Sequence, residues 1–174
     1  MKTAIIGYCG SGKSTLAQTL SARDGRPCLH MDRIGFSKNW IERDTEEGRA
    51  LMRAFLDGNG AWIIDGNYKR FLLAERLEQA DEILFFNFPR FVCFYQAFCR
   101  YLRCRGTVRD SVAEGCTEKF DWEFMRWILR DGRTKGARDA YAAILAQYPD
   151  KTTVFRRRRD VTAYLARSPR EPVN

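Results

Sequence analysis

The chain has 174 residues, of which 45% are hydrophobic and 30% are charged, and its formal net charge is +8. The apolar content predicts a folded protein of one domain over residues 1–174, and the longest apolar runs are far too short to span a membrane. The charge favours anionic partners, either phosphates or nucleic acid, without separating the two.

The N-terminus, Met1-Lys2-Thr3, leads straight into a strand-like run with no signal-peptide pattern, so we expect a cytoplasmic protein. Six cysteines are present without a Cys-x-x-Cys pair, and His30 is the only histidine, which disfavours a zinc site and a disulfide framework. Cys9 lies in a glycine loop before a helix, a position where the pKa of a thiol tends to fall.

In chain order, residues 2–6 read as a buried strand, and a helix with apolar residues at helical spacing begins at Lys13. Residues 28–31 form a second short strand, residues 33–43 look irregular, and a helix begins at Thr45. Clusters rich in Gly, Asp and Pro end both helices.

A third strand is expected at 61–64, a helix at 71–79 and a fourth strand at 82–88. Pro89 suits the first turn of the following helix. That helix carries an aromatic stripe, for which we favour packing in the core over a cofactor site. The stripe comprises Phe91, Phe94 or Tyr95, Phe98, and Tyr101 or Leu102.

Residues 106–120 show no period and are expected to form a small lid, after which Asp121 caps a helix. A helix at 137–147, a strand at 152–155 and a helix at 161–166 complete the chain. Strands without polar alternation, each followed by a helix, predict an α/β fold: a five-stranded parallel sheet with helices on both faces. Together with the motif below, this is the three-layer fold of P-loop NTPases.

Residues 7–14, Gly-Tyr-Cys-Gly-Ser-Gly-Lys-Ser, match the phosphate-loop pattern G-x-x-x-x-G-K-[ST] between a strand and a helix. The glycines let backbone amides approach phosphate oxygens, Lys13 should reach the β- and γ-phosphates of ATP, and the Ser14 hydroxyl should bind Mg²⁺. The residues expected to bind the nucleotide are Gly7, Gly10, Ser11, Gly12, Lys13, Ser14 and Thr15, with Arg156 near the base or phosphates.

Two acids follow predicted strands, at the edge of the sheet where ligands bind. Asp65 comes after an apolar run, the setting of a Walker-B acid, and we expect it to hold Mg²⁺, with a turn residue as the alternative. Asp32 is expected either to accept the proton of an attacking hydroxyl or to orient the acceptor; an ordinary turn residue is equally consistent with its position. His30 fits a buried structural residue better than a catalyst.

Arginines flank the expected lid, where guanidinium groups could stabilise the charge of a transferring phosphoryl group. Lys13, Asp32, Asp65, Arg105 and Arg109 are the predicted catalytic residues, although a solvated basic face would also explain the arginines. Besides Arg105 and Arg109, the basic residues are Arg100, Arg103, Arg126, Arg130 and Arg133.

Three segments beyond the phosphate loop resemble the bacterial DNA topology modulation (FlaR-like) proteins, which are similar to adenylate kinases. They are Trp-Ile-Ile-Asp-Gly-Asn-Tyr at 62–68, Phe-Pro-Arg at 88–90 and Ala-Glu-Gly-Cys-Thr-Glu-Lys-Phe-Asp at 113–121. The resemblance implies an adenylate-kinase-like fold, an ATP site at 7–15, a lid at 106–120 and an acceptor site between residues 32–57 and 65–68.

Two functions remain open on the sequence. A kinase would transfer the γ-phosphoryl group of ATP to a nucleotide or another small acceptor. An ATP-binding regulator would act on DNA, for which the net charge and the Arg156–Arg159 run speak, although no DNA-binding motif is visible. A GTPase switch is disfavoured because no Asn-Lys-x-Asp base-reading segment is present.

Overall fold

The computed structural model describes residues 1–104, 115 and 120–166. Within them, five strands form one sheet in the order β2-β3-β1-β4-β5, and all neighbouring strands are parallel. The strands are β1 (Lys2–Gly7), β2 (Cys28–His30), β3 (Trp62–Asp65), β4 (Glu82–Phe86) and β5 (Thr152–Phe155). The predicted five-stranded parallel sheet is confirmed.

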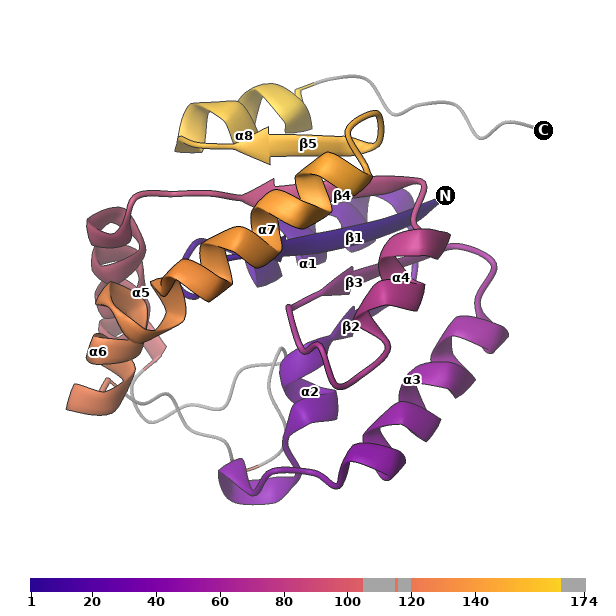
Figure 1. Cartoon of the computed structure of the whole chain (residues 1–174), viewed down its shortest axis with the longest axis horizontal. Coiled ribbons are helices and arrows are strands. Elements are labelled where there is room, and N and C mark those ends of the chain that lie inside the picture. Colours follow the sequence, from indigo (N-terminus) through magenta and orange to yellow (C-terminus); the bar gives the residue numbers. More distant parts are fainter. Residues whose placement is uncertain (105–114, 116–119, 167–174) are drawn as a thin grey trace.

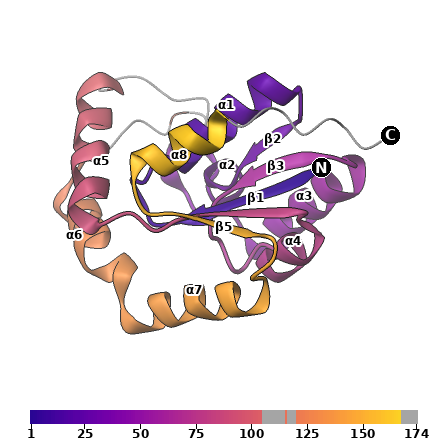
Figure 2. The same cartoon turned by 90° about the horizontal axis from the view of Figure 1, so that it is seen from above.

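Helices cover both faces of this sheet, as Figures 1 and 2 show. Helices α1 and α8 lie on one face, α4 and α7 lie on the other, and α5 and α6 stand beyond the carboxyl ends of the strands. The helices are α1 (Lys13–Asp24), α2 (Met31–Gly35), α3 (Thr45–Gly58), α4 (Leu73–Gln79), α5 (Arg90–Cys104), α6 (Trp122–Leu129), α7 (Lys135–Gln147) and α8 (Arg158–Leu165), with short 3₁₀ turns at Lys38–Trp40 and Asp131–Arg133. Among the described residues, no helix has the length and apolar character needed to cross a lipid bilayer.

The central strands are apolar on both sides because helices cover both sides. Every residue of β3 and of β4 is buried, as are all residues of β1 after Lys2. The register places Ile5 and His30 directly beside Asp65 at the carboxyl end of β3. The segments that follow β1, β2 and β3 therefore meet at one edge of the sheet.

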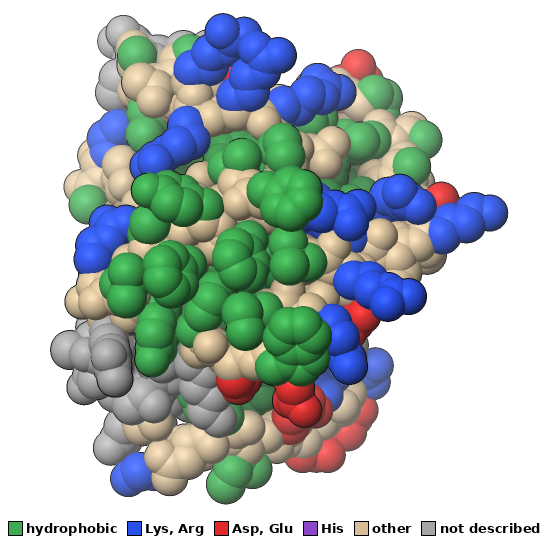
Figure 3. All heavy atoms as spheres, turned by 90° about the vertical axis from the view of Figure 1, so that its left-hand side faces the viewer, with side chains coloured by type: hydrophobic (Ala, Val, Ile, Leu, Met, Phe, Trp, Pro, Cys, Tyr) green, Lys and Arg blue, Asp and Glu red, His purple; other side chains and the backbone are tan. Residues whose placement is uncertain are grey.

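Two local expectations differ from the structure. Residues 31–35, expected to continue a strand into an irregular segment, form the helix α2. The aromatic stripe of α5 was expected in the core, but Phe91 and Tyr95 are 72% and 66% exposed, and Cys93 and Ala97 occupy the buried face instead. Figure 3 shows hydrophobic side chains gathered on this end of the molecule with Lys and Arg around them. The exposed apolar residues of α5 and α6 are Phe91, Val92, Tyr95, Phe98, Leu102, Trp122 and Trp127.

Helix α3 is held against the core through a glycine. A Cβ atom added to Gly48 would lie 2.3 Å from Cε1 of Phe71, a side chain that is completely buried. By contrast, nothing lies within 4 Å of a Cβ atom added to Gly58, at the end of the same helix.

We therefore predict that Gly48→Ala destabilises the protein by about 1–3 kcal/mol, because overpacking outweighs the better helix propensity of alanine. Urea unfolding followed by circular dichroism measures this. Gly58→Ala is the matched control and should be neutral or stabilising by roughly 0.5 kcal/mol. Equal effects of the two substitutions would contradict the packing argument.

Candidate active site

The loop between β1 and α1 is shaped by close packing. Gly7 and Gly10 have φ values of +135° and +75°. A Cβ atom at Gly7 would lie 2.4 Å from the carbonyl oxygen of Phe86, and one at Gly10 would lie 2.5 Å from that of Cys93. The loop is thus pressed between β4 and α5, where no larger residue fits.

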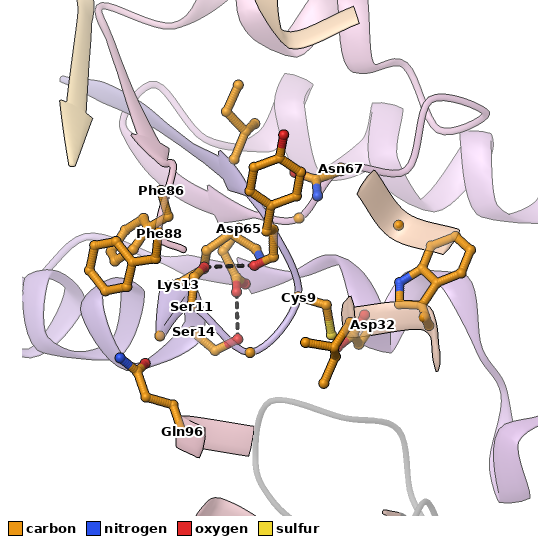
Figure 4. A pocket seen from close by; sticks show the side chains of 18 of the residues that line it. Cys9, Ser11, Lys13, Ser14, Asp32, Asp65, Asn67, Phe86, Phe88 and Gln96 are labelled. Carbon is orange, nitrogen blue, oxygen red and sulfur yellow. Dashed lines mark hydrogen bonds between the residues drawn. The ribbon is translucent and has the colours of Figure 1, made fainter. Parts of the chain in front are cut away.

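Two side chains of the loop converge on one of its carbonyl groups. The Lys13 ammonium donates to the carbonyl oxygen of Tyr8 at 2.8 Å, and the Ser11 hydroxyl donates to the same oxygen at 2.7 Å. Figure 4 shows both side chains on the loop, with Ser14 directed towards Asp65. Lys13 therefore lies at the mouth of the loop, where a triphosphate would need its charge.

Ser14 is joined to the carboxylate that follows β3. Its hydroxyl donates to Oδ2 of Asp65 at 2.6 Å, while Oδ1 of Asp65 lies 2.5 Å from Nδ1 of His30. Burial of the imidazole acts to lower the pKa of His30, but the hydrogen bond and charge of Asp65 prevail and raise it to about 10. His30 is thus a buried partner that orients Asp65.

Asn67 connects the segment after β3 to the start of the phosphate loop. Its amide oxygen accepts from the backbone N–H of Gly7 at 2.9 Å, and its amide nitrogen donates to the carbonyl oxygen of Gly7 at 2.6 Å. This pair satisfies both backbone groups of a buried residue whose neighbouring strand ends here.

On the other side of the loop, Asp32 extends from the first turn of α2. The hydroxyl of Tyr68 donates to Oδ1 of Asp32 at 2.8 Å, and burial together with the negative charge of Asp32 raises the pKa of Tyr68. Cys9 lies between the loop and Asp32 in Figure 4. Burial raises the pKa of the Cys9 thiol although Lys13 and Arg100 act to lower it, which is opposite to the direction expected for a helix N-terminus.

A buried arginine supports this arrangement from below. Arg76 of α4 is 1% exposed and donates to the carbonyl oxygens of Gly66 and Tyr68 at 3.3 and 3.2 Å. Burial lowers the pKa of Arg76 to about 10, against the charge of Asp65, which acts to raise it. Residues 65–68 are therefore fixed by contacts on both sides.

These groups face one cleft of about 1850 Å³. Pockets for a single small ligand measure roughly 300–1,000 Å³, so this cleft has room for two ligands side by side. Lys13, Ser14, Thr15, Asp32 and Asp65 all line it. The structure thus brings together the predicted loop residues and both predicted acids.

The opposite end of the cleft lies near Tyr8. The Arg133 guanidinium carbon lies 3.8 Å from the centroid of the Tyr8 ring, and the group donates to the carbonyl oxygen of Phe88 at 3.0 Å. Arg158 of α8 lines this cleft, whereas Arg156 is exposed and is not among the lining residues. All of residues 156–159 are exposed, and a role in nucleotide or DNA binding stays a prediction.

Ser14 and Asp65 fit a magnesium ion by the chemistry of their donors. A hydroxyl and one carboxylate are hard oxygen ligands, and Mg²⁺ in nucleotide sites takes few protein ligands because phosphates and water supply the rest. Within the described residues no cluster of three or more His, Cys, Asp or Glu side chains could enclose a metal alone. The pair therefore suits an ion that arrives with a nucleotide.

The predicted catalytic residues Arg105 and Arg109, and the expected lid apart from Gly115 and Phe120, lie outside the described residues. Asn67 and Arg76 were not identified as site residues from the sequence. The Asp-Gly-Asn-Tyr segment did point to this region, since its resemblance implied an acceptor site at 65–68. Nothing in the pattern around Arg76 marks it as buried.

Comparison with solved structures shows the fold. The shikimate kinase of Bacteroides thetaiotaomicron matches with a TM-score of 0.51 and 17% identity over 94% of this chain and 92% of that chain. An uncharacterized protein from Eubacterium ventriosum ATCC 27560 matches with a TM-score of 0.50 and 13% identity over 95% of each chain. The chain therefore has the fold of P-loop kinases.

A gluconokinase from Sinorhizobium meliloti 1021 also matches, with 15% identity over 88% of this chain and 80% of that chain, but its TM-score of 0.46 is too low to support an argument. No family model and no curated protein matches the chain. The resemblance to the DNA topology modulation proteins therefore stays a prediction.

The clamp of Asn67 on Gly7 leads to a test of stability. We predict that Asn67→Ala destabilises the protein by about 1–3 kcal/mol, because both backbone groups of a buried residue lose their partner. Asn67→Asp should be at least as harmful, since a carboxylate oxygen would then face the carbonyl oxygen of Gly7. Urea unfolding measures both, and Asn59→Ala, which removes one bond to the end of α3, is the milder control.

Proposed function

We propose that the protein is an ATP-dependent phosphotransferase that moves the γ-phosphoryl group of ATP to a hydroxyl group of a small acceptor. The observation that carries the proposal is the position of two carboxylates on opposite sides of one phosphate loop. Asp65 is bonded to Ser14 on the nucleotide side, and Asp32 lies across Cys9 on the other side. The fold shared with P-loop kinases is consistent with this assignment.

On the nucleotide side, the loop amides and Lys13 would bind the β- and γ-phosphates of ATP. Ser14 and Asp65 would hold Mg²⁺, which would neutralise charge on the phosphate oxygens when bound. Asp65 is kept in place for this role by the hydrogen bond from His30.

On the acceptor side, a carboxylate distinguishes between two kinds of acceptor. A phosphate acceptor already carries a deprotonated oxygen and would be repelled by Asp32. A hydroxyl acceptor must lose a proton as it attacks, and a positioned carboxylate can take it. The presence of Asp32 therefore favours a hydroxyl acceptor over a nucleoside monophosphate attacking through its phosphate.

The reaction is then a direct displacement. The acceptor hydroxyl gives its proton to the carboxylate of Asp32 as its oxygen bonds to the γ-phosphorus, and the bond from this phosphorus to the bridging oxygen of ADP breaks. The Tyr68 hydroxyl, which donates to Asp32, orients the carboxylate towards the cleft. Lys13 and Arg100, both lining the cleft, would balance the charge of the transferring group.

The nucleotide side is tested with Lys13→Met. We predict that affinity for ATP-Mg²⁺ falls by on the order of tenfold or more, because a charge-assisted contact to the phosphates is lost. The melting temperature should change little, since Lys13 bonds only to a loop carbonyl in the described contacts. Isothermal titration calorimetry measures the affinity, and an unchanged value would refute the placement of the phosphates.

The acceptor side is tested with Asp32→Asn, screened with ATP-Mg²⁺ against small hydroxyl compounds by ADP release. We predict a fall in kcat of roughly 10²–10⁴-fold with unchanged ATP affinity, because an amide cannot accept the proton. Asp57→Asn, on the exposed side of α3, is the control and should leave kcat unchanged. Full activity of Asp32→Asn, or no phosphorylated product from any acceptor, would count against the proposal.

A further inference from the structure

The turn at residues 38–40 has an unusual backbone. Asn39 and Trp40 have φ values of +59° and +61°, in the left-handed region that bulky residues rarely adopt. Asparagine tolerates this conformation, but a tryptophan in it is strained. Such strain persists only where surrounding contacts impose it, and it gathers at ligand-binding sites.

Those contacts are present on both sides of the turn. The backbone N–H and the hydroxyl of Ser37 donate to the carbonyl oxygen of Ile41 at 2.8 and 3.1 Å, which closes the turn. Gly115 lies against it from another part of the chain. A Cβ atom at Gly115 would lie 2.4 Å from Oδ1 of Asn39, so only glycine fits there without a shift.

The turn places Trp40 at the end of a row of aromatic rings. Trp40 meets Phe36 edge to face with 5.1 Å between ring centroids, and Phe36 meets Tyr68 in the same manner at 6.4 Å. All three rings line the cleft. The row ends at Asp32, which accepts from the hydroxyl of Tyr68.

This aromatic wall lies on the acceptor side of the phosphate loop. The charge of Asp32 acts on both Tyr68 and Cys9, and the Cys9 thiol also lies within reach of the charges of Lys13 and Arg100. A molecule resting on the wall would thus place a hydroxyl group near Asp32 and face the loop across Cys9.

We propose that Trp40, Phe36 and Tyr68 form the acceptor subsite and that the acceptor is a hydroxyl compound built on a ring, either an aromatic base with a sugar or a sugar ring alone. Faces and edges of aromatic side chains attract the faces and C–H edges of rings, and a ring loses little conformational freedom when it packs there. The acceptor's role in phosphoryl transfer rests on the function proposed above, whereas ring binding does not.

The subsite is tested first with matched probes. We measure binding of adenosine and methyl glucoside, and of the acyclic ribitol and glucitol, by saturation-transfer NMR and calorimetry, with and without a non-hydrolysable ATP analogue. At least one ring probe should bind at least about tenfold more tightly than its acyclic counterpart. The comparison of adenosine with methyl glucoside distinguishes a base from a sugar ring.

Trp40→Gly separates function from folding. Glycine adopts the left-handed conformation without strain, so the melting temperature should stay constant or rise. Affinity for the ring probe should fall roughly fivefold to tenfold while ATP affinity is unchanged, and Trp40→Phe should retain most of it. Ile41→Ala, at an exposed neighbour that does not line the cleft, is the control.

Unchanged ring affinity in Trp40→Gly, preference for the acyclic probes, or failure of every ring probe to bind would each overturn the subsite. A wild-type protein that binds rings through Trp40 but transfers no phosphoryl group would overturn the proposed function and leave the subsite standing.

Discussion

Hydrogen bonds from one short segment, residues 65–68, hold the two sides of the cleft in register. Asp65 accepts from Ser14 on α1, Asn67 pairs with the backbone of Gly7, and Tyr68 donates to Asp32 on α2. The expected magnesium pair and the expected base thus depend on the same stretch of backbone. A shift of this segment would move both at once, so the distance between nucleotide and acceptor is set by its geometry.

That dependence explains why a charged side chain lies beneath the segment. A buried guanidinium loses its hydration, which disfavours burial by several kcal/mol unless hydrogen bonds and an opposite charge compensate. Arg76 has both: two carbonyl oxygens of the segment accept from it, and the charge of Asp65 acts on it. Its planar group fixes Gly66 and Tyr68 relative to each other, which a flexible amine would do less well. Arg76 is a positioning residue for the cleft.

The fold and part of the site could be predicted from sequence for the same physical reason. Buried strands ending in glycine or aspartate indicate a parallel sheet, and parallel strands bring their carboxyl ends together, so Ser14, Asp32 and Asp65 were expected at one edge. Asn67 and Arg76 could not be found in this way, because their partners are backbone groups up to 60 residues distant in sequence. Such contacts leave no periodic pattern.

The aromatic stripe of α5 shows where periodicity misleads, and why. The phosphate loop approaches this helix so closely that a Cβ atom at Gly10 would lie 2.5 Å from the carbonyl oxygen of Cys93 and 3.3 Å from Cβ of Ala97. Only small side chains fit on that face, so the large rings turn outwards. The same crowding buries Cys9 and raises the pKa of its thiol, which keeps it neutral beside the place where a phosphoryl group would pass. A thiolate there would repel the phosphate oxygens; a neutral thiol leaves the field to Lys13 and Arg100.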